Sequence, residues 1–429
     1  AIKALQTDSS GSCAIIETTG NHYVTLDSIL LIGTAKLHKS FLTGYLGFKR
    51  KGAYSEAKVQ NVSSAFSHLP FLTLTQSPAV AFSEDKAALY IYANKQKINK
   101  FDAFIGIVPS DNTTSKVLIT GSLLLDLHNI CTIGENIRLN WQSIQRASQT
   151  LDIFTSFPCL FYSSFGVDGA FLLDKRDSSA LDLNATAAVR YYLQKTNYLR
   201  GFYEYKHSRL LSTDYQDVIS LSVEDRDFDA NIYGLEFFMQ NLDNIFNPRK
   251  GYVFSVSASL GKRQIRKNLH LPDSLYNSLA LSAIQSCVKA GVSFYFPIKQ
   301  RWVWYLGSKM GYLYSPQLLH NELFRIGGFA TLRGFDEQSI YANLYLTLTN
   351  EIRFLFLRDS YLQLFFDAGW FEQRLSSTYV SGFPFGFGAG ISFSTKAGAF
   401  AFSYALGKHP QNPFKIGSGR LTFGYVAVF

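Results

Sequence analysis

The sequence predicts a mainly β protein, in which a small α+β domain precedes a sixteen-stranded antiparallel transmembrane β-barrel. Three observations lead to this prediction. Aromatic residues are frequent, with 37 Phe and 25 Tyr in 429 residues. Segments that alternate apolar with small or polar residues follow one another through most of the chain, at roughly the length and spacing of barrel strands. No apolar run reaches the roughly 18 residues that a membrane-spanning helix needs.

The chain divides into three regions. Residues 1–27 are polar and are expected to be irregular, and residues 28–95 are expected to form the small α+β domain. Within this domain a strand is expected at SILLIGTA, which begins at Ser28, and two more around residues 71–80 and 87–93.

One helix is predicted between the first two of these strands. Ser55 is a plausible N-cap and Pro70 marks the end. The apolar residues between them recur at three- and four-residue spacing, which places on one face Val59, Val62, Phe66 and Leu69.

Residues 96–429 carry the barrel prediction. In YLQLFFDAGW one face is apolar, with Leu362, Leu364, Phe366, Ala368 and Trp370. The other face is mixed, with Tyr361, Gln363, Phe365, Asp367 and Gly369. The segments FGFGAGISF and AFAFSYALG repeat the pattern with glycine, alanine and serine on the second face. A soluble β-sandwich is the alternative, but it would have nothing to bury so many apolar outer faces.

The net charge of +9 comes from scattered residues, apart from one short basic cluster of Lys262, Arg263, Arg266 and Lys267. Nucleic-acid binding would require a basic stripe with aromatic platforms, so no nucleic-acid partner is expected. The cluster is interpreted as a solvated loop or a contact with lipid headgroups.

Metal, cofactor and enzyme chemistry are not expected. The four cysteines are far apart and show none of the spacings of zinc or redox sites: Cys13, Cys131, Cys159 and Cys287. No phosphate-binding loop, Gly-x-Ser-x-Gly elbow or His-Glu-x-x-His motif occurs.

Several segments together carry a family resemblance. GGFATLRGF, which begins at Gly327, resembles the signature loop of the outer-membrane barrel-assembly and two-partner-secretion superfamily, with its BamA-, TamA- and TpsB-type barrels. NLDNIFNPRKGYVFSVSASLG, LQLFFDAGW and the segments from FGFGAGISF to FGYVAVF resemble further parts of this barrel in the same order. Residues 28–95 resemble one POTRA domain, the periplasmic substrate-handling unit of which the family usually carries several.

The resemblance implies that the loop after strand eleven folds back into the barrel lumen. Arg333 is then expected to form ion pairs with Glu351 and Asp367, which strand periodicity places on the polar faces of their strands. Breaking a desolvated pair of this kind costs about 3–5 kcal/mol. In the alternative, Arg333 lies in an extracellular loop without a partner.

The rest of the loop motif has expected roles as well. Phe335 is expected to pack on the inner wall. Gly327, Gly328 and Gly334 would allow tight backbone approach.

A barrel that passes polypeptide needs one strand pair that can open. The first strand, FDAFIGIVP, carries Gly106 and is expected to pair with the last strand through Phe429. Glycine and proline weaken a strand ladder, so this pair is a candidate seam, although many first strands are short for other reasons.

The resemblance implies a non-enzymatic outer-membrane insertase or translocase whose N-terminal domain lies in the periplasm. Its expected partners are unfolded outer-membrane or secreted polypeptides and outer-membrane lipids, with periplasmic or lipoprotein subunits as further candidates. A dedicated secretion pore, an accessory barrel subunit of a larger complex and a passive channel stay open as alternatives.

Overall fold

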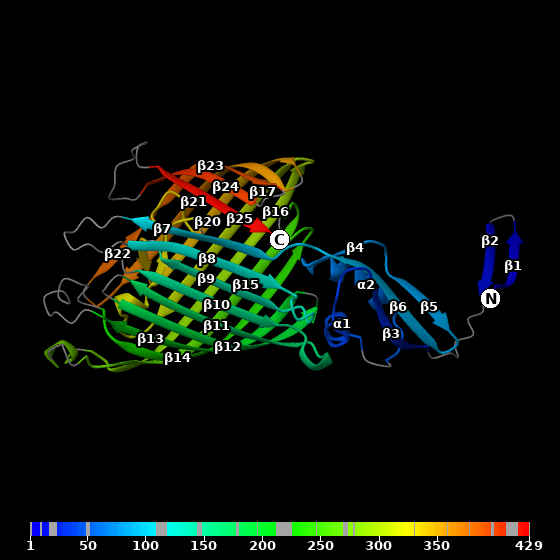
Figure 1. Ribbon diagram of the computed structural model, residues 1–429, viewed down its shortest axis with the longest axis horizontal. Coiled ribbons are helices and arrows are strands. Elements are labelled where there is room, and N and C mark those ends of the chain that lie inside the picture. Colours follow the sequence, from blue (N-terminus) through cyan, green and yellow to red (C-terminus); the bar gives the residue numbers. More distant parts are fainter. Residues whose placement is uncertain are drawn as a thin grey trace.

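The computed structural model describes most of the chain, namely residues 2–8, 11–16, 24–48, 52–108, 118–143, 148–176, 180–194, 196–211, 225–245, 247–268, 273–277, 279–329, 331–357, 359–376, 378–395, 399–408 and 419–428. These residues form a large barrel with a small domain at one end (Figure 1). Among them, no helix is long and apolar enough to cross a membrane.

The barrel is closed and antiparallel. Its strands follow the chain in order, and the last strand pairs with the first. Both β22 and β23 pair with β21, at successive positions along it. The strands are β7 (Lys100–Val108), β8 (Leu118–His128), β9 (Asn136–Ser143), β10 (Gln149–Phe157), β11 (Phe165–Arg176), β12 (Ala180–Gln194), β13 (Asn197–Leu210), β14 (Phe228–Leu242), β15 (Gly251–Ile265), β16 (Ser282–Lys299), β17 (Trp302–Tyr314), β20 (Leu344–Leu357), β21 (Ser360–Arg374), β22 (Tyr379–Gly382), β23 (Phe385–Ser394), β24 (Ala399–Lys408) and β25 (Arg420–Val428).

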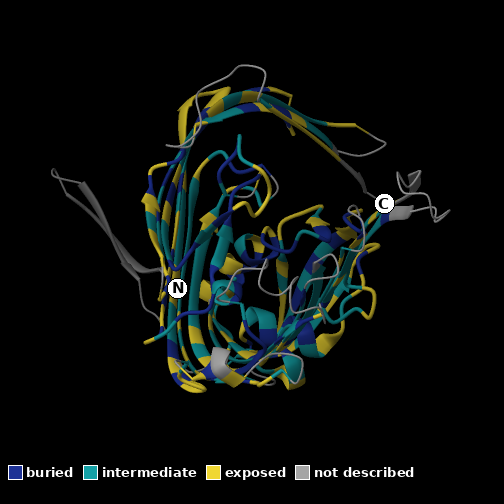
Figure 2. Ribbon diagram, turned by 90° about the vertical axis from the view of Figure 1, so that its left-hand side faces the viewer, coloured by how far each residue is buried: buried dark blue, intermediate teal, exposed yellow. Residues whose placement is uncertain are grey.

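The two faces of the wall follow the predicted alternation. On β21, Leu364 and Phe366 are exposed on the outside, whereas Phe365 and Asp367, which alternate with them, are buried on the inside. The same alternation of exposed with buried or half-buried residues continues around the wall in Figure 2. The period of two therefore separates an apolar outer surface from a polar lumen, which is the pattern of a barrel in lipid.

The small domain is built on a four-stranded sheet covered by two helices. β3 (Thr25–Ile32) pairs in parallel with β6 (Lys86–Lys95), and β6 also pairs with β4 (Leu72–Leu74) and β5 (Ala79–Ser83). The helix α2 (Glu56–Phe66) has Ser55 at its N-cap and buries three of the four predicted apolar residues within it, Val59, Val62 and Phe66.

Three expectations for the N-terminal region differ from the structure. Residues 1–27 were expected to be irregular, but they contain the hairpin of β1 (Ile2–Asp8) and β2 (Gly11–Ile16) and the start of β3. The strand expected over residues 71–80 is two strands, β4 and β5, each on a different part of β6.

The third difference is the helix α1 (Lys39–Leu46), which was not predicted. It has a glycine in its interior and lacks an acidic first turn, so its signal is weak. His38 accepts a hydrogen bond from the Ser40 backbone at its N-terminus, and Gly47 closes it in the left-handed conformation.

Helix α1 fastens the small domain to the barrel. It packs on η1 (Leu160–Tyr162), the turn between β10 and β11, and buries Cys159 beside that turn. A Cβ atom on Gly44 would lie 2.5 Å from the carbonyl oxygen of Ser163, so only glycine allows this approach. Phe41 likewise occupies the space in front of Gly134, in the turn between β8 and β9.

Candidate functional site in the barrel lumen

The connection between β17 and β20, residues 315–343, folds back into the barrel. It contains η3 (His320–Glu322) and the two-stranded sheet of β18 (Phe324–Ile326) and β19 (Ile340–Ala342). The segment that carries the Arg-Gly-Phe motif lies between these two short strands, and its side chains contact residues of the inner wall.

Arg333 lies at the centre of this site. Its Nε and Nη2 donate to the two carboxylate oxygens of Asp367 at 2.7 and 2.6 Å, and its Nη1 donates to Glu351 at 2.6 Å. Its backbone N–H also donates to Asp367, at 3.1 Å. The guanidinium stacks over the ring of Phe365, 3.7 Å from the centroid. The structure thus brings Arg333, Glu351 and Asp367 together in one buried ion-pair cluster.

The glycines around the arginine permit contact between backbones. Gly334 has a φ of 93°, and a Cβ on it would lie 2.6 Å from the backbone nitrogen of Gly407 on β24. A Cβ on Gly386 of β23 would lie 2.1 Å from the carbonyl oxygen of Arg333. Gly327 and Gly328 also have positive φ, at 113° and 89°. The loop therefore lies directly on the glycine positions of two wall strands.

The two phenylalanines of the motif lie in different surroundings. Phe335 packs beside a buried apolar cluster that includes Leu332 on the loop and Phe371 on the wall. Phe329 is half exposed and lines a lumen cavity of about 440 Å³.

A second arginine extends the cluster, and its role was not predicted. Arg353 donates to the other oxygen of Glu351 at 2.6 Å, so this carboxylate lies between two guanidinium groups. Three tyrosine rings surround Arg353 at 4.8–5.6 Å from their centroids: Tyr295, Tyr305 and Tyr361. Strand periodicity placed Arg353 on the same polar face as Glu351, but the rings come from three other strands.

The base of the loop is held by two further arginines whose partners the sequence did not predict. Arg263 was expected in a solvated loop or at lipid headgroups, but it lies on β15 and is fully buried. Arg325 on the loop contacts Asp174 and Asp182 on the wall at 3.4 and 3.2 Å. Arg263 on β15 has the opposite arrangement, because here the arginine is on the wall and its partner, Glu322, is on the loop, at 2.8 Å. Both side chains of the second pair are almost fully buried. Among the described residues, buried or partly buried arginine–carboxylate ion pairs therefore attach the loop to the wall at three places.

The expected seam residues are not part of this site. Gly106 lies opposite Thr120 in the ladder between β7 and β8. Phe429 lies outside the described residues. The pairing of β25 with β7 consists of Ala427 with Phe101 and Val428 with Lys100.

No group of three or more His, Cys, Asp and Glu in the described part of the chain could hold a metal ion. The site is instead a salt-bridged loop inside a closed antiparallel barrel, which defines a transmembrane barrel with an internally anchored loop. The profile of the Omp85 superfamily domain matches residues 137–424. The chain belongs to the Omp85 superfamily, a group of outer-membrane β-barrel proteins.

Solved structures with the same fold agree with this assignment. BamA from Haemophilus ducreyi lacking POTRA domains 1–3 is 15% identical, covers 99% of this chain and 89% of its own, and has a TM-score of 0.55. CdiB from Acinetobacter baumannii is 13% identical and has a TM-score of 0.62, and the match covers 95% of this chain and 74% of the CdiB chain. CdiB from Escherichia coli is 14% identical and has a TM-score of 0.54, and the match covers 97% of this chain and 93% of the CdiB chain. No curated protein matches the chain by sequence.

Proposed function

We propose that this protein inserts or exports unfolded polypeptides at the outer membrane. The small domain acts as a POTRA-like periplasmic receiver, and the barrel opens at the seam between its first and last strands. In this proposal β22 and β23 count as one strand, which makes a barrel of sixteen strands. The Arg333 cluster anchors the loop that occupies the lumen.

The observation that carries the proposal is the short pairing at the seam. Among the described residues, β25 pairs with β7 through two residue pairs, whereas its ladder with β24 has seven and the ladder of β7 with β8 has nine. Backbone groups that lack a ladder partner can accept an added strand. The weakest junction of the wall is therefore also the one best suited to receive a client strand.

A similar edge is present in the small domain. β3 pairs with β6 along one side, and on the other side the described residues contribute an isolated bridge between Thr25 and Ala53. The rest of that edge can accept an extended peptide by strand addition. This supports a receiving role for the domain.

The anchored loop favours this function over a passive channel. Ion pairs of Arg263, Arg325 and Arg333 hold the loop within the barrel, whereas an open porin needs an unobstructed aqueous lumen. A dedicated secretion pore is the second candidate, because CdiB proteins share this fold.

Cross-linking the seam tests the proposal. Phe101→Cys and Ala427→Cys face each other in the seam, in a background from which the native cysteines are removed. We expect oxidation to stop client insertion or export and reduction to restore it. The matched control is Ala401→Cys with Gly424→Cys, which lie opposite each other in the adjacent ladder of β24 and β25. Unimpaired activity of the oxidised seam variant would refute the seam mechanism.

Depletion of the protein in its native bacterium separates the two candidate functions. Quantitative mass spectrometry of outer-membrane and secreted fractions would show broad loss of unrelated barrels for a general insertase. A dedicated secretion pore would lose one or a few exported proteins and leave other barrels intact.

A further inference from the structure

The structure divides the basic cluster of the sequence between the two faces of the barrel wall. Arg263 points into the lumen and is fully buried against Glu322. Lys267 forms an exposed ion pair with Asp273. Lys262 and Arg266 are exposed, and Lys262 lies on the outer face, opposite Asn231 on β14.

These two cations lie at the rim of the barrel farthest from the small domain. The turn between β14 and β15 lines a cavity together with residues of the small domain, so the opposite ends of these strands lie at the far rim. In the proposed orientation this rim faces the outer leaflet of the outer membrane. The inference uses that orientation from the proposed function, but it does not depend on transport activity.

The height of Lys262 on the wall matches the membrane surface. The outward positions of β15 before it are all apolar: Tyr252, Phe254, Val256, Ala258 and Leu260. Eight residues of a strand tilted by about 40° span about 20 Å along the barrel axis, close to the apolar band of about 25 Å in such barrels. Leu260 and its cross-strand neighbour Tyr233 are both more than 60% exposed. Lys262 is therefore the first outward polar position above the lipid-facing band.

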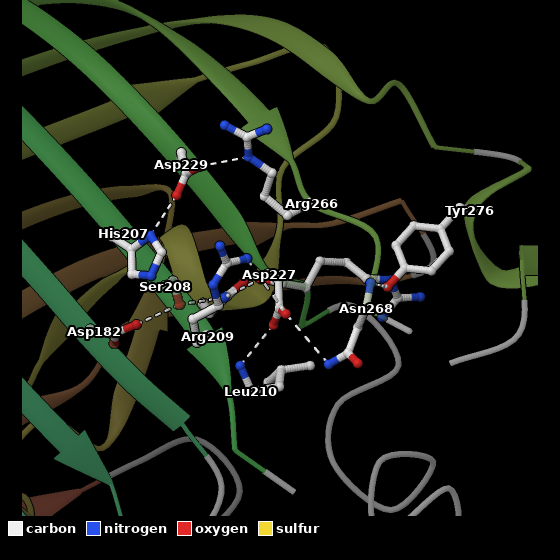
Figure 3. A network of polar contacts seen from close by, with 12 residues as sticks. Asp182, His207, Ser208, Arg209, Leu210, Asp227, Asp229, Arg266, Asn268 and Tyr276 are labelled. Carbon is white, nitrogen blue, oxygen red and sulfur yellow. Dashed lines mark hydrogen bonds and ion pairs between the residues drawn. The ribbon is translucent and has the colours of Figure 1, made fainter. Parts of the chain in front are cut away.

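Two buried carboxylates, Asp227 and Asp229, lie next to the cations, and Asp229 orients Arg266. Asp229 accepts hydrogen bonds from Nδ1 of His207 at 2.5 Å and from Nε of Arg266 at 2.6 Å (Figure 3). Asp227 accepts hydrogen bonds from the Leu210 backbone and from Asn268. Both side chains are at most 9% exposed. Beside these two buried carboxylates, the exposed side chains of Lys262 and Arg266 are cations.

Within the described residues, both cations keep donor groups that no other side chain uses. Arg266 uses Nε for Asp229, and its two terminal nitrogens have no hydrogen-bond partner within the described residues. Lys262 likewise has no ion pair with any residue that the structure describes. Arg209, next to Asp227 at 3.7 Å, adds a third, partly exposed cation at the same rim. Guanidinium and ammonium groups are the side-chain groups that bind phosphate oxygens most strongly.

We propose that Lys262 and Arg266 bind the phosphate of an outer-leaflet lipid headgroup, while the acyl chains of that lipid lie against the apolar surface around Leu260 and Tyr233. The continuity of the basic patch with the lipid-facing band favours a lipid over a free anion or an acidic protein. Each basic residue near a membrane surface contributes about 1 kcal/mol to binding, so loss of both predicts roughly 30-fold weaker binding.

Native mass spectrometry of the detergent-purified full chain with lipid A tests this site. We expect Lys262→Gln with Arg266→Gln to weaken lipid A binding roughly 30-fold. The control is Lys299→Gln with Arg301→Gln, which removes the same charge from the exposed turn at the opposite rim and should bind like the wild type. Dephosphorylated lipid A should bind to the wild type as weakly as lipid A binds to the double variant.

Three results would overturn the proposal. The double variant could bind lipid A as tightly as the wild type does, or the wild type could bind dephosphorylated lipid A as tightly as lipid A. Millimolar inorganic phosphate alone could also displace lipid A from the wild type. If the double variant does not fold, Lys262→Gln serves alone, because Lys262 has no polar partner in the described chain. This single variant is expected to bind lipid A about fivefold more weakly than the wild type, and unchanged lipid A binding would also overturn the proposal.

Discussion

Replacement of Arg333 by alanine is expected to destabilise the barrel because it leaves a carboxylate buried without its partner. Glu351 keeps its contact with Arg353 at 2.6 Å. Among the described residues, Asp367 keeps only the hydrogen bond from the backbone N–H of residue 333, at 3.1 Å, and its side chain is 1% exposed. The substitution therefore removes the charged partner mainly from Asp367.

The magnitude follows from the burial of this pair. Breaking a buried ion pair by removing one partner costs about 3–5 kcal/mol. The same loop offers a matched control, because Arg420 pairs with Asp336 at 2.7 Å with both side chains more than half exposed. An exposed pair of this kind contributes about 0–1 kcal/mol, so Arg420→Ala should change stability little.

The measurement is the free energy of unfolding in urea for the protein folded in lipid vesicles, followed by circular dichroism and by heat-modifiability. We expect Arg333→Ala to lose about 3–5 kcal/mol and the double variant with Asp367→Asn to recover part of this loss, because the unpaired charge is then absent. If Arg333→Ala loses no more than Arg420→Ala, the idea that Arg333 anchors the loop is refuted.

The remaining predictions concern the loop base and the attachment of the small domain. Arg263→Met should cost about 3–5 kcal/mol of unfolding free energy in the same urea assay, because Glu322 is left buried without its cation; a loss below about 1 kcal/mol would contradict this. Gly44→Leu should separate α1 from η1, because a side chain there meets the Ser163 carbonyl, whereas Lys39→Leu on the exposed side of α1 should leave the attachment intact. Burial raises the pKa of Cys159 to about 12, so its thiol should stay protonated and unlabelled by maleimide at pH 8 in the wild type. In variants whose only cysteine is Cys159, labelling should rise with Gly44→Leu but not with Lys39→Leu, and equal labelling of the two would exclude α1 as the attachment.

The alternation of apolar with small or polar residues along each strand made the two faces of the barrel wall predictable. Because successive strand side chains point to opposite faces, residues 345–370 could be divided between lumen and lipid before any pairing was known. Glu351 and Asp367 lie on the inner face for this reason, and Arg333 lies in a segment whose glycines suit close backbone contact. The same period sends Lys262 outward and Arg263 inward in the structure, although the sequence interpretation had assigned both to one solvated loop or lipid contact.

The partners of these residues were decided by the tertiary structure. Arg325 meets Asp174 and Asp182, which lie 151 and 143 positions away in the sequence, and Arg353 meets tyrosines from three other strands. Such contacts depend on strand register, barrel closure and the path of a long loop. Helix α1 is a similar case, because its contact with η1 brings Gly44 against a turn more than 100 residues away. The sequence by itself determined which face each strand residue occupies, since that depends on local geometry. Only the tertiary structure determined which residues meet across the lumen and at the domain interface.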